Sequence, residues 1–127
     1  MSVTVKVKRK KNPQKPGDKG KFYGISTSKG NIDIFGMARK ISKRSTVSET
    51  DVIAVIMAFI ELIPEELLDG YIIELGDLGH LRLTVHGDGV ENKEDYSTNL
   101  IDRVSVRFLP SKRIKTQLKT ATFTKSA

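Results

Sequence analysis

Leu75-Gly76-Asp77-Leu78-Gly79 separates two stretches that have the period of a β-strand. The glycines and the aspartate within this segment predict a tight turn. Beyond it, Leu81, Leu83 and Val85 alternate with polar residues, as in a strand with one apolar face. We therefore expect strands at 71–75 and 81–86, joined by this turn.

The chain after this pair predicts a third strand and a last helix. Val104, Val106 and Phe108 alternate with polar residues, which indicates a strand at 103–108. Residues 87–102 join it to the second strand and form a long polar loop or a protruding arm. Pro110 stops the strand, and Ser111 caps a helix whose Ile114 and Leu118 face inward. Residues 121–127 are expected to form a loose tail.

The chain before the turn contains the strongest helical pattern. Ser48-Glu49-Thr50-Asp51 has the form of a capping box, with Asp in place of the usual Glu. An apolar stripe follows, and its width indicates burial against a second subunit. Pro64 predicts a bend or a restart near Ile63, and Gly70 closes the helix. The stripe contains Val52, Val55, Ile56, Phe59, Ile60, Ile63 and Leu67.

The first 45 residues predict a hairpin and a shorter helix. Val3, Val5 and Val7 alternate with polar residues, and a second strand is expected at 22–28. The segment between them, 12–20, contains two prolines and two glycines and is therefore a loop. Helical spacing then relates Ile34, Met37, Ala38 and Ile41.

Composition predicts one globular domain with a polyanionic partner. The chain has 127 residues, no cysteine and a formal net charge of +7. Residues 1–30 carry +8, 31–48 carry +3, 49–102 carry −11 and 103–127 carry +7. Both ends are thus basic, and if they fold side by side they make one positive surface. No apolar run is long enough to span a membrane, and no secretory signal is visible at the start.

The alternation in the sheet predicts a phosphate-binding face. Arg82, Arg103 and Arg107 occupy polar positions of strands whose other face is apolar, so in neighbouring strands they share one face. Lysines of the last helix continue it, and the alternative is a solvated sheet face. The DNA-binding candidates are Arg82, Arg103, Arg107, Lys112, Arg113, Lys115 and Lys119, with Lys6, Lys8, Arg9, Lys10 and Lys11 of the first strand.

Enzymatic patterns are weak. His80 and His86 lie roughly 20 Å apart along one strand, too far for a shared metal ion. Neighbouring acids such as Glu65 and Glu66 face different ways, and no phosphate loop or EF-hand spacing occurs. We therefore expect no catalytic residue, no metal site, no cofactor and no small-molecule substrate.

Taken in order, these segments resemble the bacterial HU/IHF histone-like DNA-binding family. The residues that carry the resemblance are Ser45-Thr46-Val47-Ser48 with Asp51-Val52, Leu68-x-Gly70, Leu75-Gly76-Asp77-Leu78-Gly79 and Phe108-Leu109-Pro110-Ser111-Lys112. The HU-like domain covers 31–120, with the arm at 87–102 and a tail at 121–127. Residues 1–30, with Tyr23 after the proline loop, look like the β-hairpin extension of HU-like proteins from the Bacteroides group.

The resemblance implies an α+β fold in an intertwined homodimer. Helices would form the base, each three-stranded antiparallel sheet would carry a β-arm, and a C-terminal helix would follow. Family members wedge an arm-tip proline between base steps. Here no proline lies between Leu78 and Pro110, and the arm has a charge of −4. The basic hairpin would then replace the lost arm charge. Deleting residues 1–28 should therefore weaken binding sharply, and unchanged affinity would contradict this expectation.

The predicted function is that of a cytoplasmic, nucleoid-associated protein. It would bind double-stranded DNA through the backbone with little sequence preference, and so organise or condense DNA or assist DNA transactions. Two alternatives stay open. One is a protein-interaction module that keeps the HU fold. The other is an RNA-binding module, for which Phe22 and Tyr23 are the only adjacent aromatic residues.

Overall fold

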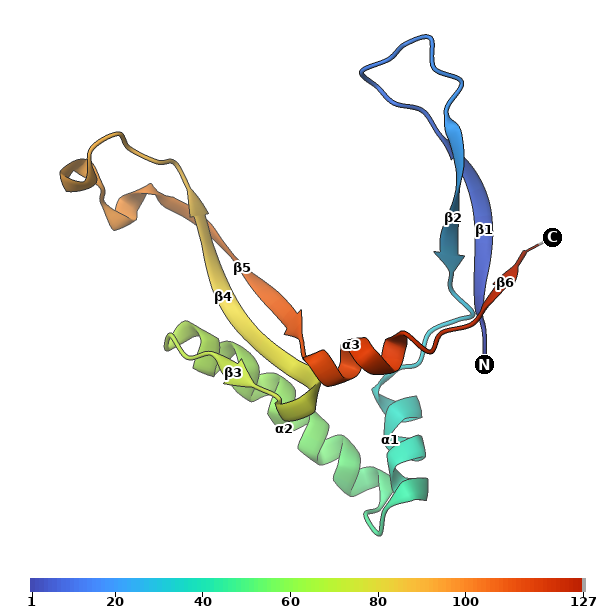
Figure 1. Cartoon of the computed structure of the whole chain (residues 1–127). Coiled ribbons are helices and arrows are strands. Elements are labelled where there is room, and N and C mark those ends of the chain that lie inside the picture. Colours follow the sequence, from blue (N-terminus) through green and yellow to red (C-terminus); the bar gives the residue numbers. More distant parts are fainter. Residues whose placement is uncertain (127) are drawn as a thin grey trace. The chain divides into compact units, whose positions relative to one another are not determined.

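The computed structural model describes residues 1–126 and has a mixed α+β architecture (Figure 1). It contains three α-helices and two three-stranded sheets. The chain folds into two compact units. The N-terminal unit is Met1–Asp33 together with the chain from Leu118 onward, and the central unit is Ile34–Gln117.

The N-terminal unit is a sheet with the order β2-β1-β6. Strands β1 (Val3–Lys10) and β2 (Lys21–Thr27) form the expected hairpin. Strand β6 (Phe123–Lys125) runs parallel to β1, and Val3 N–H donates to Thr122 O at 2.8 Å. The expectation of a loose tail from 121 is therefore wrong for 123–125, because backbone pairing with β1 orders them; Ala127 lies outside the described residues.

Two side chains shape the loop between β1 and β2. Asn12 Oδ1 accepts from Gln14 N–H, and Asp18 Oδ1 accepts from Gly20 N–H, both at 3.0 Å. Gly20 has φ 78°, and a Cβ there would lie 2.4 Å from Lys10 O. The chain therefore passes close to the end of β1 at a position that only glycine fits.

The central unit begins with helices α1 (Ile34–Arg44) and α2 (Glu49–Leu68). Ser48 caps α2 as predicted, its side chain accepting from Asp51 N–H at 3.2 Å. The predicted restart near Ile63 is absent, because α2 continues through Pro64. After the helix, Gly70 N–H donates to Leu67 O and Tyr71 N–H to Glu66 O, with Gly70 at φ 94°. This is a Schellman ending, as the glycine predicted.

The second sheet has the order β3-β4-β5 and is antiparallel. Its strands are β3 (Ile73–Glu74), β4 (Gly79–Gly87) and β5 (Ile101–Pro110), and the 3-10 turn η1 (Gly76–Leu78) joins the first two. Gly79 has φ 139°, and a Cβ there would lie 2.2 Å from Leu109 O. This glycine allows β4 to start against the end of β5.

Helix α3 (Lys112–Leu118) is fixed to this turn by Ser111. The Ser111 hydroxyl donates to Asp77 O and accepts from Ile114 N–H, while Ser111 N–H donates to Leu78 O at 3.1 Å. One serine therefore caps the helix and ties it to η1. Leu118, predicted to face inward, is 67% exposed.

The segment between β4 and β5 is not a β-ribbon. Strand pairing stops at Gly87 and Ile101, with a bulge beside His86 and Gly87. Between them lie two short 3-10 helices, η2 (Lys93–Asp95) and η3 (Thr98–Leu100). The predicted long polar loop is therefore confirmed for 88–100, whereas the β-arm that the resemblance implied is not formed by strands there, because the polar residues make local turns instead of a strand ladder. We call residues 88–100 the acidic loop.

Little apolar surface is buried within one chain. Among the described residues, only Ala38, Val52 and Leu67 are buried hydrophobic side chains. Helix α2 leaves Val55 67% exposed, and Phe59 and Ile60 are also exposed. Helix α2 contacts α1, β3 and β4, so the small core of the central unit lies along it.

Within residues 1–126, no helix is both long and apolar enough to cross a membrane.

Candidate nucleic-acid interface

One face of the β4–β5 ribbon carries all three predicted arginines. Arg82 pairs directly with Arg107, and His86 pairs with Arg103. Directly opposed residues in antiparallel strands project to the same side, and so do residues four apart on one strand. Arg82, Arg103 and Arg107 therefore share a face, as the alternation predicted. We call it the arginine face.

The residues between these arginines on the same face are polar and hydrogen bonded to one another. Thr84 Oγ1 and Ser105 Oγ lie 2.7 Å apart, and His86 Nε2 lies 2.9 Å from the same Ser105 oxygen. These contacts link the two strands through side chains as well as backbone. They lie at the centre of the arginine face, with the Arg82–Arg107 pair at one end and Arg103 at the other.

The arginines themselves are available to a ligand. All three are exposed, and neither of the ion pairs Arg39–Glu49 and Arg113–Asp77 involves them. Each guanidinium presents five N–H donors in a planar fork that matches a phosphate. The arginine face can therefore hold several phosphate groups along a backbone.

The opposite face of the same ribbon is apolar. Its cross-strand pairs are Leu81 with Phe108, Leu83 with Val106 and Val85 with Val104. Val104 and Val106 are 55% and 59% exposed, so this face is uncovered in the single chain. The sheet is thus amphipathic, with cations on one side and exposed valines on the other.

The structure divides the predicted cations around α3. Lys112 and Lys115 lie on the helix and are exposed. Arg113 Nη1 lies 2.5 Å from Asp77 Oδ2, so this arginine ties α3 to η1. Lys119 follows the end of the helix and belongs to the N-terminal unit. The predicted stripe Lys112, Lys115 and Lys119 is therefore not one helix face.

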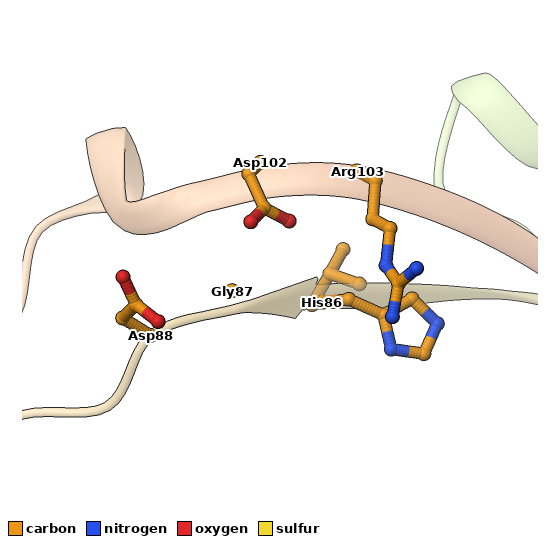
Figure 2. Close-up of a pocket in the computed structure, with 6 residues that line it drawn as sticks. His86, Gly87, Asp88, Asp102 and Arg103 are labelled. Carbon is orange, nitrogen blue, oxygen red and sulfur yellow. The ribbon is translucent and has the colours of Figure 1, made fainter.

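Carboxylates border the arginine face at the acidic loop. An open depression there is lined by Val85, His86, Gly87, Asp88, Asp102 and Arg103. Figure 2 shows the Asp88 and Asp102 carboxylates at the loop end and the Arg103 side chain beside His86. The positive potential therefore falls off toward the loop, and a polyanion is favoured over the sheet and repelled at its tip.

The N-terminal sheet carries a second set of cations. The pairs Lys6 with Ile25, Lys8 with Tyr23 and Lys10 with Lys21 place these residues on one face. Arg9 is on the other face, with its guanidinium carbon 4.9 Å from the centre of the Phe22 ring. The run Lys6 to Lys11 is therefore not one patch, because neighbouring strand residues alternate sides. We call the side with Lys6, Lys8, Lys10, Lys21 and Tyr23 the lysine face.

Two cations of this region were absent from the predicted site. Lys21 and Lys15 lie with Lys10 and Lys11 around one depression, which Asn12, Asp18 and Tyr23 also line. Lys21 could have been found from the sequence by closing the hairpin around the proline loop, which brings it opposite Lys10.

No metal-binding group of three or more His, Cys, Asp or Glu side chains occurs in the described part of the chain. His86 serves the hydrogen-bonded centre of the sheet, and His80 lines a separate depression with Glu74, Gly76, Gly79 and Ser111.

A capped long helix, a glycine turn and an antiparallel sheet with a basic face define an HU-like domain, here with an added N-terminal sheet. The chain belongs to the HU-HIG family, described as an HU domain fused to wHTH, Ig, or Glycine-rich motif, whose model matches residues 1–125. The resemblance to HU proteins is thereby confirmed.

A solved structure has a similar fold. It is a protein from Bacteroides vulgatus ATCC 8482, provisionally described as a bacterial DNA-binding protein, with a TM-score of 0.68 and 12% identity. The match covers 98% of this chain and 48% of that one, so the present chain spans about half of its length. No curated protein is significantly similar to the chain.

Proposed function

We propose that this chain binds double-stranded DNA through its phosphate backbone, with little sequence preference. The observation that carries the proposal is the arginine face, where three exposed arginines, none of them in the ion pairs described above, share one side of a hydrogen-bonded ribbon. Backbone contacts of this kind do not read sequence. Lys112 and Lys115 of α3 add charge from the same unit. DNA binding also accords with the family and with the description of the Bacteroides protein.

The binding species would be an intertwined homodimer. The exposed side chains of α2 and the uncovered valines of β4–β5 are more apolar surface than a soluble monomer normally shows. A second copy would cover these faces and present a second arginine face. Sedimentation of the full chain should give twice the mass of one chain, and a monomer at micromolar concentration would contradict the dimer.

The biological role would be nucleoid organisation or assistance to DNA transactions in the cytoplasm. The acidic loop contains no proline and no basic residue besides Lys93. A wedge between base steps would therefore not come from this loop, and DNA would be covered or condensed without a sharp kink. The lysine face would supply the cations that the loop lacks.

A protein-interaction module is the second candidate, and the acidic loop favours it. A loop with four carboxylates repels phosphate and suits a basic protein surface. Capture of a partner protein that survives nuclease treatment would support this candidate. The RNA-binding alternative loses its aromatic pair, because Phe22 and Tyr23 are on opposite faces of β2.

A salt titration tests the proposal. Labelled random-sequence duplex DNA would be titrated with the full chain over a series of salt concentrations. Affinity should fall steeply and linearly on a log–log plot, because counterions are released from each neutralised phosphate. No binding at low salt would contradict the proposal and favour the protein-interaction module.

A further inference from the structure

The lysine face of the N-terminal sheet combines cations with one exposed aromatic ring. Lys8 lies directly opposite Tyr23, and Lys21 is two residues before Tyr23 on the same strand. Tyr23 is 47% exposed. A large ring in a field of like charges contributes little to a core, whereas an exposed ring between cations suits a flat, anionic ligand.

The spacing of the lysines suits an extended chain of charges. Lys6, Lys8 and Lys10 are every second residue of β1, which places them roughly 6.8 Å apart along the strand. A linear polyanion lying along β1 would meet a cation at each repeat. A lysine side chain carries a compact charge on a flexible stem. It can therefore contact a polyanion whose backbone is not held in one helical form.

The row of lysines leads into the depression at the hairpin loop. Lys10, Lys11, Lys15 and Lys21 line it together with Tyr23, against one carboxylate, that of Asp18. Asp18 accepts from Gly20 N–H, and Asn12 accepts from Gln14 N–H, so both are engaged in shaping the loop. Four cations around one hollow repel each other, and a phosphate group seated there relieves that repulsion.

From these three observations we propose that the lysine face binds an unpaired polynucleotide strand. Tyr23 would stack on one base, and the lysines would hold the phosphates on either side. The inference rests on the proposed function and goes beyond it, because duplex DNA keeps its base faces stacked on each other and offers none to Tyr23. The arginine face would take most of the duplex backbone, and the lysine face, which would also add charge to duplex binding, would hold the unpaired strand.

Binding of labelled oligo(dT) of roughly 12 nucleotides to the full chain tests the proposal. Tyr23→Ala should weaken this binding roughly tenfold, whereas Tyr23→Phe, which keeps the ring, should not. Phe22→Ala is the matched control, since it removes an aromatic ring from the other face of the same strand and should leave the affinity unchanged. Circular dichroism would confirm that each variant is folded.

A second pair of variants tests the cations. Lys10→Gln with Lys21→Gln should weaken oligo(dT) binding and flatten its salt dependence, whereas Lys29→Gln, beyond the end of β2, should do neither. The same measurements with oligo(rU) show whether the unpaired strand is DNA or RNA. The preferred ligand is the one that binds more tightly and whose affinity depends on Tyr23.

Three results would overturn the inference. The first is equal oligo(dT) affinity of Tyr23→Ala and the unaltered chain. The second is an equal loss in Phe22→Ala. The third is duplex binding without binding of either oligo(dT) or oligo(rU), which leaves the proposed function intact. Failure to bind either DNA would instead contradict the proposed function together with the inference.

Discussion

The two sheets of this chain share a plan and differ in chemistry. Each has three strands and one strongly basic face; the other face is apolar in the β4–β5 ribbon, whereas in the N-terminal sheet it also carries Arg9. The β4–β5 ribbon carries arginines on a face whose centre is cross-linked by hydrogen bonds among Thr84, Ser105 and His86. The N-terminal sheet carries lysines around a tyrosine. Arginine forks on a rigid surface suit phosphates at fixed positions, whereas lysines accommodate a flexible chain. The difference indicates that charge alone does not define the ligand.

The largest expected effect separates the two faces on duplex DNA. Replacing Arg82, Arg103 and Arg107 together by Gln should weaken duplex binding about a hundredfold for each chain bound, because three phosphate contacts are lost. Replacing Lys6, Lys8 and Lys10 by Gln removes the same charge and should cost about tenfold. Fluorescence anisotropy with one labelled duplex measures both. Equal losses of affinity would show that the two faces contribute equally to duplex binding.

The second prediction compares the sheets in stability. Gly79→Ala should lower the free energy of unfolding by about 2 kcal/mol, because φ 139° is strained for alanine and its Cβ would meet Leu109 O. In the N-terminal sheet, a Cβ on Gly24 would meet only the Val5 Cγ1 side-chain atom, at 2.7 Å. Gly24→Ala should therefore cost less. Thermal denaturation followed by circular dichroism would rank the two, and the reverse order would contradict the packing described for Gly79.

The third prediction concerns the acidic loop beside the arginine face. Neutralising Asp88, Glu91, Glu94 and Asp95 by Asn or Gln should raise duplex affinity about tenfold at low salt, since it removes repulsion near phosphate. Glu61→Gln with Glu65→Gln on α2 is the charge control and should have a smaller effect. If the loop variant binds duplex no better than the unaltered chain, the loop lies away from DNA.

The smallest expected effects are at the junction of η1 and α3. Ser111→Ala removes the cap of α3 and the link to Asp77 O, and should cost about 1 kcal/mol of stability. Asp77→Ala breaks only the exposed ion pair with Arg113 and should cost about 0.5 kcal/mol or less. Urea denaturation of both variants measures these costs. A larger loss of stability in Asp77→Ala than in Ser111→Ala would show that the ion pair, and not the cap, stabilises this junction.

Local patterns predicted much of this fold. Helix α2 begins after Ser48 and ends before Gly70 as predicted, because capping depends on a few neighbouring residues. Alternation also placed the three arginines on one face, because period and register together decide it. Lys119 fell outside α3 because the helix ends at Leu118, a boundary that no glycine or proline marks.

Long-range pairing was beyond the same patterns. Strand β6 has three residues and is ordered by β1, more than a hundred residues earlier in the chain. Pro64 was expected to bend α2 or to restart it near Ile63, and the restart does not occur, because a helix whose apolar stripe continues on both sides can tolerate one lost hydrogen bond. Strand alternation also separates Arg9 from the lysine face, a distinction that the predicted group of five cations did not make.

The most direct test of the arginine face is the salt dependence of duplex binding in two proteins measured side by side. The unaltered chain and the Arg82, Arg103 and Arg107 to Gln variant would be titrated on the same duplex. The log–log slope should become shallower by about 2.7 for each chain bound, at about 0.9 for each lost phosphate contact. An unchanged slope would contradict this prediction and place the DNA phosphates elsewhere on the molecule.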